Sequence, residues 1–393
     1  MKALYRLTGY TVLTLALLAG CGGAPAIPAP PSASKAVTDL TVTAQRELEI
    51  EGTRLISLSP DGQWLVATRG KAICIVAVET LADKHCIDLQ TGSPDVRALV
   101  WSPDSKRLVF TEDLMRFMLE SDVWLLDIEG GQLTNLTPDE VTGGFLKQGK
   151  EAGTLLDAVP GWSPDGQTVI FSRSDRAAGS TSLYRLSIKG GTPEKIIEAT
   201  SQGPLALWYS PRWLGNNKLV YTVLHPKLSE PANGIWLADS NGQNARQLLA
   251  PDPKIGPPAL ADVSPKSDYA LVWYPMFAGQ YGAESNVTWF ALLDLNKGES
   301  VPLKPAGEFM SPANARFSPD GSKLAYVYRT LDKQVNLVIR DVQSGAENTV
   351  LTQSGILGAN TESPMQGLDW ANNDTLYAAT GPGVGVLLTL GSE

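Results

Sequence analysis

The sequence predicts an all-β fold: a seven-bladed β-propeller of four-stranded antiparallel blades, closed by an N-terminal strand that completes the last blade. Three observations support this prediction. One turn motif recurs seven times, apolar alternating strands flank each copy, and the chain is rich in residues that interrupt helices. With 37 Gly and 27 Pro among 393 residues, a mostly helical protein is excluded.

Residues 1–20 have the layout of a secretory signal peptide. Lys2 and Arg6 precede an apolar run, Tyr10 to Ala19, that is too short to span a membrane comfortably. The run ends in Leu18-Ala-Gly-Cys21, which resembles the lipobox of bacterial lipoproteins. The resemblance implies an exported protein whose Cys21 carries acyl chains such as palmitate and anchors it to a bacterial membrane of the cell envelope.

The segment after Cys21 has the composition of a linker. Residues 21–36 are rich in Pro, Ala and Gly and have few large apolar side chains that a core could bury. We therefore assign them to the lipid anchor and a semi-extended linker. Residues 37–393 then form the propeller domain.

The repeated motif has a mechanical explanation. Its clearest copies are Ser-Pro-Asp followed by Gly or Ser and an apolar run, and they begin at Ser59, Ser102, Ser163 and Ser318. Weaker copies begin at Trp213, Ser264 and Trp370. Pro presets φ for a turn, Asp tolerates the next position, and Gly supplies the left-handed residue that reverses two antiparallel strands. The Ser therefore belongs to a hairpin and not to a catalytic site.

Each repeat continues into two further strands. After the second copy these are Asp122–Ile128 and Leu133–Leu136, joined by the tight turn Glu129-Gly-Gly131. The last repeat has only three strands, ending near Leu390. The alternation in Leu40–Thr43 and Leu48–Glu51 predicts that the N-terminal segment supplies the missing fourth strand, which leaves no large open edge.

These turns and strands resemble the TolB-type (WD-like) propeller repeats of bacterial envelope proteins, which also occur in prolyl oligopeptidase-like enzymes. The resemblance covers about residues 53–391 and implies a fold rather than a function. Two departures matter. There is no room for the α/β domain that precedes the TolB propeller, and there is no G-x-S-x-G nucleophile elbow of an α/β-hydrolase.

Cys74 and Cys86 lie on consecutive predicted strands and would face each other across a hairpin centred on Thr80. Export permits a disulfide between them, which we favour over two buried thiols. A register shift of one residue would place the sulfurs on opposite faces.

The chain has two His, His85 and His225. His85 lies in an alternating strand, whereas His225 lies in an inserted loop where it could contact a ligand. Two scattered His do not build a His-rich metal site, and a Ser-His-Asp triad would depend on His225 alone. We therefore predict no metal, no other cofactor and no catalytic residue, while paired carboxylates remain open because sequence does not show their geometry.

The net charge of -9 argues against nucleic acid as a partner. We expect a monomeric, lipid-anchored binding or scaffold protein, not an enzyme, that docks a protein, peptide or envelope glycan. One alternative is an envelope hydrolase or lyase using carboxylates near the central channel, which would show carboxylates of raised pKa there. Another is a structural role in an envelope assembly.

Loop lengths predict which face binds. In each blade the first and third connections are short turns on one face, and the longer second connections and interblade links share the other face. Long loops in a compact domain tend to be functional, and these carry Met, aromatic and Arg residues that are enriched at interfaces. The predicted ligand-binding residues are Arg116, Phe117, Phe145, His225, Phe277 and Tyr281.

Overall fold

A computed structural model gives the fold of the chain. It describes residues 37–89, 99–111, 121–139, 155–175, 178–198, 211–225, 230–253, 256–274, 289–303, 309–330, 334–354 and 367–392. The chain divides into two compact units, Met1–Lys35 and Ala36–Glu393, and the described residues all belong to the second. Within them, we find no helix with the length and apolar character needed to span a membrane.

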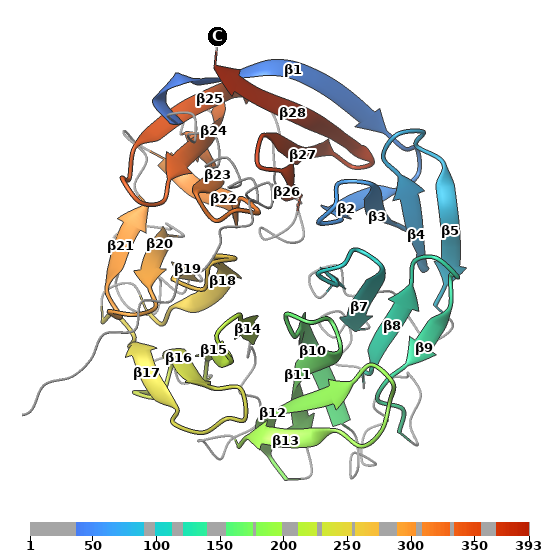
Figure 1. The fold of residues 1–393 in the computed structure, drawn as a ribbon, viewed down its shortest axis with the longest axis vertical. Coiled ribbons are helices and arrows are strands. Elements are labelled where there is room, and N and C mark those ends of the chain that lie inside the picture. Colours follow the sequence, from blue (N-terminus) through green and yellow to red (C-terminus); the bar gives the residue numbers. More distant parts are fainter. Residues whose placement is uncertain are drawn as a thin grey trace, which may run out of the picture. The chain divides into compact units, whose positions relative to one another are not determined.

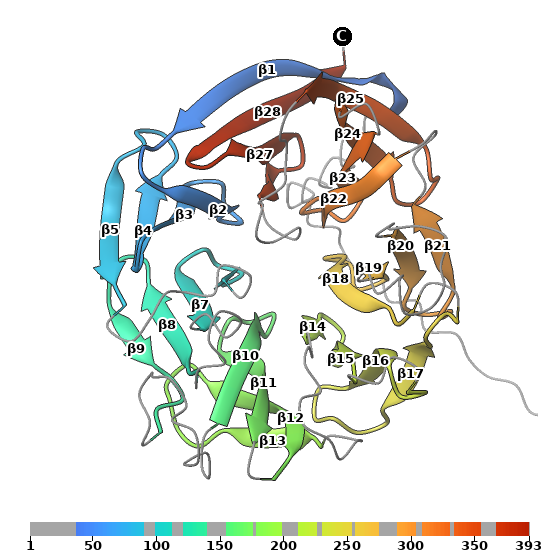
Figure 2. The ribbon, with the colours of Figure 1, turned by 180° about the vertical axis from the view of Figure 1, so that it is seen from behind.

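Seven four-stranded antiparallel sheets surround a common axis, as Figures 1 and 2 show from the two faces. The predicted seven-bladed propeller is confirmed. The innermost strands of blades 1 to 7, in order, are β2 (Arg54–Leu58), β6 (Val100–Trp101), β10 (Leu155–Trp162), β14 (Arg212–Leu214), β18 (Ala259–Val263), β22 (Phe309–Phe317) and β26 (Leu368–Asn372).

The remaining strands follow outwards in chain order. The second strands are β3 (Trp64–Arg69), β7 (Arg107–Thr111), β11 (Thr168–Asp175), β15 (Lys218–Val223), β19 (Tyr269–Tyr274), β23 (Lys323–Thr330) and β27 (Thr375–Gly381). The third strands are β4 (Ala72–Ala77), β8 (Val123–Asp127), β12 (Ser180–Ser187), β16 (Gly234–Asp239), β20 (Trp289–Asp294), β24 (Gln334–Asp341) and β28 (Val384–Ser392). The outer strands are β5 (Asp83–Asp88), β9 (Leu133–Asn135), β13 (Glu194–Ile197), β17 (Arg246–Leu249), β21 (Ser300–Leu303), β25 (Glu347–Ser354) and, for blade 7, β1 (Leu40–Glu49).

The core lies between neighbouring blades. The second strands are buried on both faces, and Leu65, Val66 and Ala67 of β3 have no exposed surface. This explains why the run after each turn motif is continuously apolar, as is typical of strands covered on both sides.

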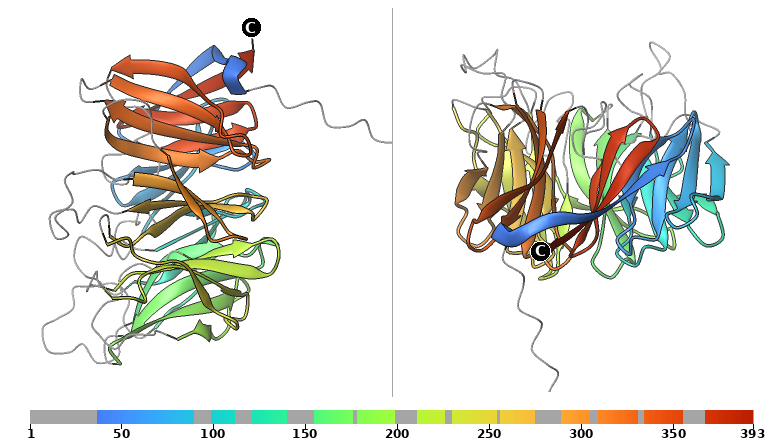
Figure 3. Two further views of the ribbon diagram at one scale, coloured as in Figure 1. Left: turned by 90° about the vertical axis from the view of Figure 1, so that its left-hand side faces the viewer. Right: turned by 90° about the horizontal axis from the view of Figure 1, so that it is seen from above.

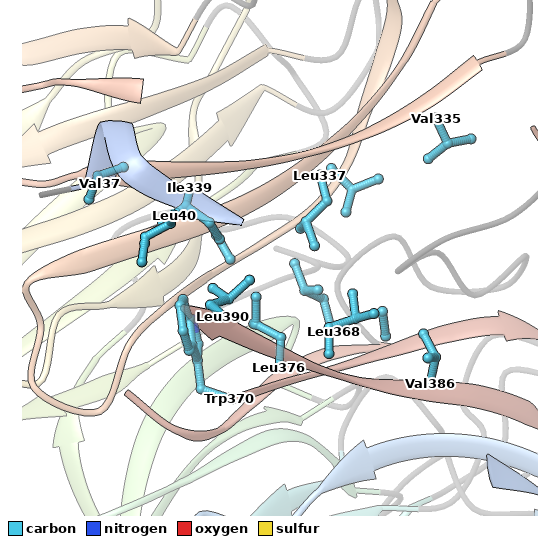
Figure 4. Packing of buried hydrophobic residues seen from close by; sticks show 14 residues of the cluster. Val37, Leu40, Val335, Leu337, Ile339, Leu368, Trp370, Leu376, Val386 and Leu390 are labelled. Atoms are coloured by element: carbon cyan, nitrogen blue, oxygen red, sulfur yellow. The ribbon is translucent and has the colours of Figure 1, made fainter. Parts of the chain in front are cut away.

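The N-terminal strand closes the ring as predicted. A 3₁₀ turn, η1 (Val37–Asp39), leads into β1, which pairs antiparallel with β28 from Leu40 opposite Ser392 to Glu49 opposite Val384. Figure 4 shows Val37 and Leu40 packed with Ile339 of blade 6 and Leu390 of blade 7 in one apolar cluster. The first and last parts of the propeller therefore share a core.

The antiparallel order gives the propeller two different faces, seen edge-on in Figure 3. We call the face that carries the Ser-Pro-Asp turns the short-turn face and the opposite one the long-loop face. Inner strands run from the long-loop face to the short-turn face, so their last residues lie next to the turns.

Candidate functional site

The Ser-Pro-Asp turns are fixed by their own side chains. In the four Ser-Pro-Asp copies the Ser donates its hydroxyl to the Asp two residues later, at 2.6 Å for Ser59 to Asp61 and 2.7 Å for Ser318 to Asp320. The same hydroxyl oxygen accepts a backbone N–H from the start of the second strand, at 3.0 Å from Trp64. The Ser163 hydroxyl donates to Asp165 at 2.6 Å, and this hydrogen bond lowers the pKa of Asp165. These Ser residues are turn elements, as the sequence predicts.

Strand register defines seven equivalent positions around the axis, each two residues before the turn. We call this set the axial ring. Its members, from blade 1 to blade 7, are Ser57, Val100, Gly161, Arg212, Asp262, Arg316 and Asp369. Three consecutive blades contribute small or apolar residues, and the next four contribute Arg, Asp, Arg and Asp. The ring is therefore charged on one side only, near the short-turn face.

Asp369 and Arg316 form an ion pair within the ring, with Arg316 Nε 3.6 Å from Asp369 Oδ1. Their side chains are 20% and 16% exposed, so protein surrounds them while solvent still reaches them. Asp369 Oδ2 also accepts the backbone N–H of Leu58 at 3.0 Å. Burial raises the pKa of Asp369 to about 6, although Arg316 and the hydrogen bond act in the opposite direction.

Arg212 and Asp262 complete the charged side of the ring. Asp262 Oδ2 accepts the backbone N–H of Phe317 at 3.2 Å, and Arg212 donates to the carbonyl of Pro211 at 2.9 Å. Burial lowers the pKa of Arg212, Asp262 raises it, and Arg316 lowers it again. The two guanidinium groups therefore lie within each other's electric field, and the charge of Asp262 opposes the repulsion at Arg212.

A second charged pair lies towards the long-loop face. Arg173 donates to both oxygens of Asp157, at 2.6 and 2.7 Å, and the two side chains are 13% and 1% exposed. The guanidinium also lies 5.4 Å from the ring of Phe171 and 5.3 Å from that of Tyr184. Burial raises the pKa of Asp157, and Arg173 opposes this effect. Because the pair is buried and both Asp157 oxygens accept from Arg173, we assign it a structural role.

Most residues that the sequence predicts for ligand binding lie outside the described residues: Arg116, Phe117, Phe145, Phe277 and Tyr281, together with the lipidation site Cys21. His225 is half-buried, and its backbone N–H donates to the side chain of Asn233. His85, in blade 1, has its Nε2 3.1 Å from the carbonyl of Glu129 in blade 2.

Cys74 and Cys86 face each other on β4 and β5 and are joined by a disulfide bond. Cys74 is fully buried and Cys86 is exposed. The bond lies in the outer half of blade 1, away from the axial ring, so it supports the blade rather than the site.

Solved structures of enzymes share this fold. An oligogalacturonate lyase in complex with manganese matches with a TM-score of 0.60 at 12% identity, covering 90% of this chain and 91% of that chain. The oligogalacturonate lyase of Vibrio parahaemolyticus matches with a TM-score of 0.59 at 12% identity, covering 90% and 98%. TolB from Acinetobacter baumannii is also similar, with a TM-score of 0.44 at 14% identity, covering 85% and 78%. At such identities the likeness shows the fold alone.

No protein-family model matches the sequence, and no curated protein matches it. The expectation that this chain is not an enzyme is nevertheless wrong. It rested on the lack of a triad and of a His-rich site, and the two lyases show that this fold houses enzymes.

The manganese of the first lyase provides a test of metal binding. Within the described ranges, the one group of three possible ligands is Cys74, Asp83 and Cys86. Both sulfurs are in the disulfide and cannot bind as thiolates, and manganese prefers oxygen ligands. The described residues do not fit a manganese site, and we derive no step through a metal.

Proposed function

We propose that this chain acts on an acidic saccharide at the axial ring, as a lyase or hydrolase in which the Asp369 carboxylate takes up the proton. The observation that carries the proposal is the environment of Asp369, which raises its pKa to about 6. Asp369 is therefore a stronger base than an ordinary Asp, and it is still ionised at neutral pH. Its side chain is accessible to solvent, as a reacting group must be.

The Arg residues favour an anionic substrate. Guanidinium groups bind carboxylates through paired N–H donors, and Arg212 and Arg316 occupy equivalent ring positions in blades 4 and 6. A uronate sugar presents one carboxylate that such groups could hold. The lyases of the same fold carry the name of an acidic saccharide, which agrees with this substrate class, but the class is inferred from the ring charges.

An elimination would use these groups as follows. Asp369 takes the proton from the carbon beside the uronate carboxylate, a carbon–carbon double bond forms, and the glycosidic oxygen leaves the adjacent carbon and takes a proton from water. Negative charge builds on the substrate carboxylate during the first step, and the Arg side chains stabilise it. Hydrolysis would instead activate a water molecule and leave no double bond.

The experiment follows product formation from oligogalacturonate, alginate and hyaluronan fragments, by ultraviolet absorbance for elimination and by reducing ends for hydrolysis. We expect one substrate to react, with a rate that rises with pH through about 6, because only ionised Asp369 acts as the base. Asp369→Asn should lower the rate at least about 100-fold. Asp83→Asn, at an exposed position on β5, is the control. No reaction with a folded protein, or full activity of Asp369→Asn, would contradict the proposal.

We also propose that the chain is exported, lipid-anchored at Cys21 and monomeric, and that its long-loop face docks a protein, peptide or glycan partner. The support for a docking face is loop length: the connections from β7 to β8 and from β19 to β20, which lie at that end of the blades, are much longer than the Ser-Pro-Asp turns. Replacing Phe117, Phe145 and Phe277 by Ser should abolish capture of an envelope partner without lowering the melting temperature. An unlipidated Cys21 in the mass spectrum would refute the anchor.

A further inference from the structure

Two equivalent positions come together near the short-turn face where neighbouring blades meet. One is the residue just before each turn, on an inner strand, and the other is the first residue of the second strand of the preceding blade; at four junctions the second lies beside the first or packs against its cluster. We call these the platform residue and the cover residue. The platforms from blade 1 to blade 7 are Leu58, Trp101, Trp162, Trp213, Val263, Phe317 and Trp370, and the covers are Trp64, Arg107, Thr168, Lys218, Tyr269, Lys323 and Thr375.

At three junctions a large cover residue packs against an aromatic platform or its cluster. The Arg107 guanidinium lies 5.8 Å from the ring of Trp162, and Tyr269 packs against the cluster that contains Phe317. Trp64 packs in the same way against the cluster that contains Trp101. The platforms Trp101, Trp162 and Phe317 at these junctions are only 8%, 8% and 6% exposed.

The junction between blades 3 and 4 departs from this rule. Its platform is Trp213, an aromatic residue, but its cover is Thr168, which is too short to lie across an indole. Trp213 is accordingly only half-buried, and it lines a pocket of about 310 Å³ together with Thr168. At this junction a short cover residue meets an aromatic platform, and the space beside the indole stays open.

The rest of the pocket lining is polar and electrically balanced. Arg185 donates to both oxygens of Glu194, at 2.9 Å each, and Ser187 and Thr192 also line the pocket. Because the two charges cancel, the pocket has little attraction for an anion. The third guanidinium nitrogen and the hydroxyls can still exchange hydrogen bonds with a neutral ligand.

We infer that this pocket binds a neutral sugar ring. The apolar face of a pyranose stacks on an indole, while its hydroxyls meet a mixed set of donors and acceptors, and the lining of this pocket includes both. Its volume is at the small end of ligand pockets, which span about 300 to 1,000 Å³, and suits a single sugar unit. The inference does not rest on the proposed function, since none of these side chains belongs to the axial ring.

The test uses the full-length protein and three probes: methyl glucoside, methyl galactoside and N-acetylglucosamine, titrated by tryptophan fluorescence and saturation-transfer NMR. We expect at least one to bind with a Kd of about 1 to 10 mM. Thr168→Tyr should weaken that binding at least tenfold with an unchanged melting temperature, since Tyr269 already occupies the same position in blade 5. Thr375→Tyr, the same change at the cover position of blade 7, should leave binding intact.

A second variant covers the case that Thr168→Tyr does not fold. Glu194 is exposed, so Glu194→Gln should fold normally and still weaken binding several-fold by unbalancing Arg185. No binding of any probe up to about 50 mM, or binding that survives both changes, would overturn the inference. Galacturonate distinguishes the two sites. If it still binds to Thr168→Tyr but not to Arg212→Met, it binds at the axial ring. If the neutral probes show that same pattern, they do not bind in the pocket and the inference is refuted.

Discussion

The carboxylate of Asp369 accepts a hydrogen bond from the backbone N–H of Leu58, 3.0 Å away and 311 residues earlier in the chain. Asp262 makes the same contact with Phe317 between blades 5 and 6. Trp162 and Trp370 use the opposite arrangement and donate an indole N–H to a carbonyl of the preceding blade. Neighbouring blades are thus bonded to each other close to the axis, and Asp369 makes this bond between the last blade and the first.

Asp369 should make the folded state less stable as the pH rises. Its pKa is raised to about 6, so between about pH 4 and 6 the unfolded chain releases this proton before the folded chain does, and stability falls with increasing pH. Asp369→Asn removes the effect. Relative to wild type, this variant should gain up to about 3 kcal/mol between pH 4 and pH 7. Urea unfolding at both pH values measures it, and parallel pH profiles of the two proteins would show that Asp369 titrates normally.

The β1 strand should carry a large part of the stability of the ring. Leu40 and Leu48 are 1% and 0% exposed, so replacing either by Ala should lower the free energy of unfolding by about 2 to 5 kcal/mol. Gln45→Ala on the exposed side of the same strand should change it by less than about 0.5 kcal/mol. Thermal unfolding of the three variants tests this. Equal, small effects would mean that β1 is not needed for closure.

The disulfide should stabilise blade 1 by restricting the unfolded chain. Cys74 and Cys86 are separated by 12 residues, and closing a loop of this size contributes roughly 3 kcal/mol in the chain-entropy description. Cys74→Ala combined with Cys86→Ala should lower the urea midpoint accordingly. A reducing agent should shift wild type to the same midpoint and leave the double variant unchanged. A wild-type midpoint that does not respond to complete reduction would contradict this role.

The buried pair Asp157 and Arg173 should be intolerant of single changes. Arg173→Met leaves a carboxylate buried without its partner, which costs about 3 to 5 kcal/mol, and adding Asp157→Asn should recover part of that loss. The more exposed pair Arg185 and Glu194, 34% and 61% exposed, provides the comparison, since Arg185→Met should cost less than about 1 kcal/mol. Additive losses in the Asp157 and Arg173 double variant would exclude coupling between them.

The fold could be predicted because its signals are local and repeated. Seven turn motifs specify seven hairpins, and the alternation near Leu40 identifies the strand that completes blade 7. The pairing of Cys74 with Cys86 followed from counting residues across one hairpin. Each of these inferences needs only neighbours in the sequence or a tight turn between them.

The axial ring was missed because its residues are far apart in the sequence and each is unremarkable alone. A signal was present: aligning the repeats two residues before the turn shows Arg212, Asp262, Arg316 and Asp369 in successive copies. The raised pKa of Asp369 could not be predicted in any case, because it depends on burial by other blades. The expected aromatic residues of the long loops lie outside the described residues.

The pairing of β1 with β28 also sets an order of events during synthesis. The Thr41 hydroxyl donates to the carbonyl of Gly391, 350 residues later, so the first strand of the propeller needs its last strand as a partner. Contacts between such distant segments form late because a very long chain must first close on itself. Until then β1 is an unpaired edge that can add to a strand of another copy. Ring closure is therefore the step at which intramolecular pairing of β1 with β28 competes with strand addition between two chains.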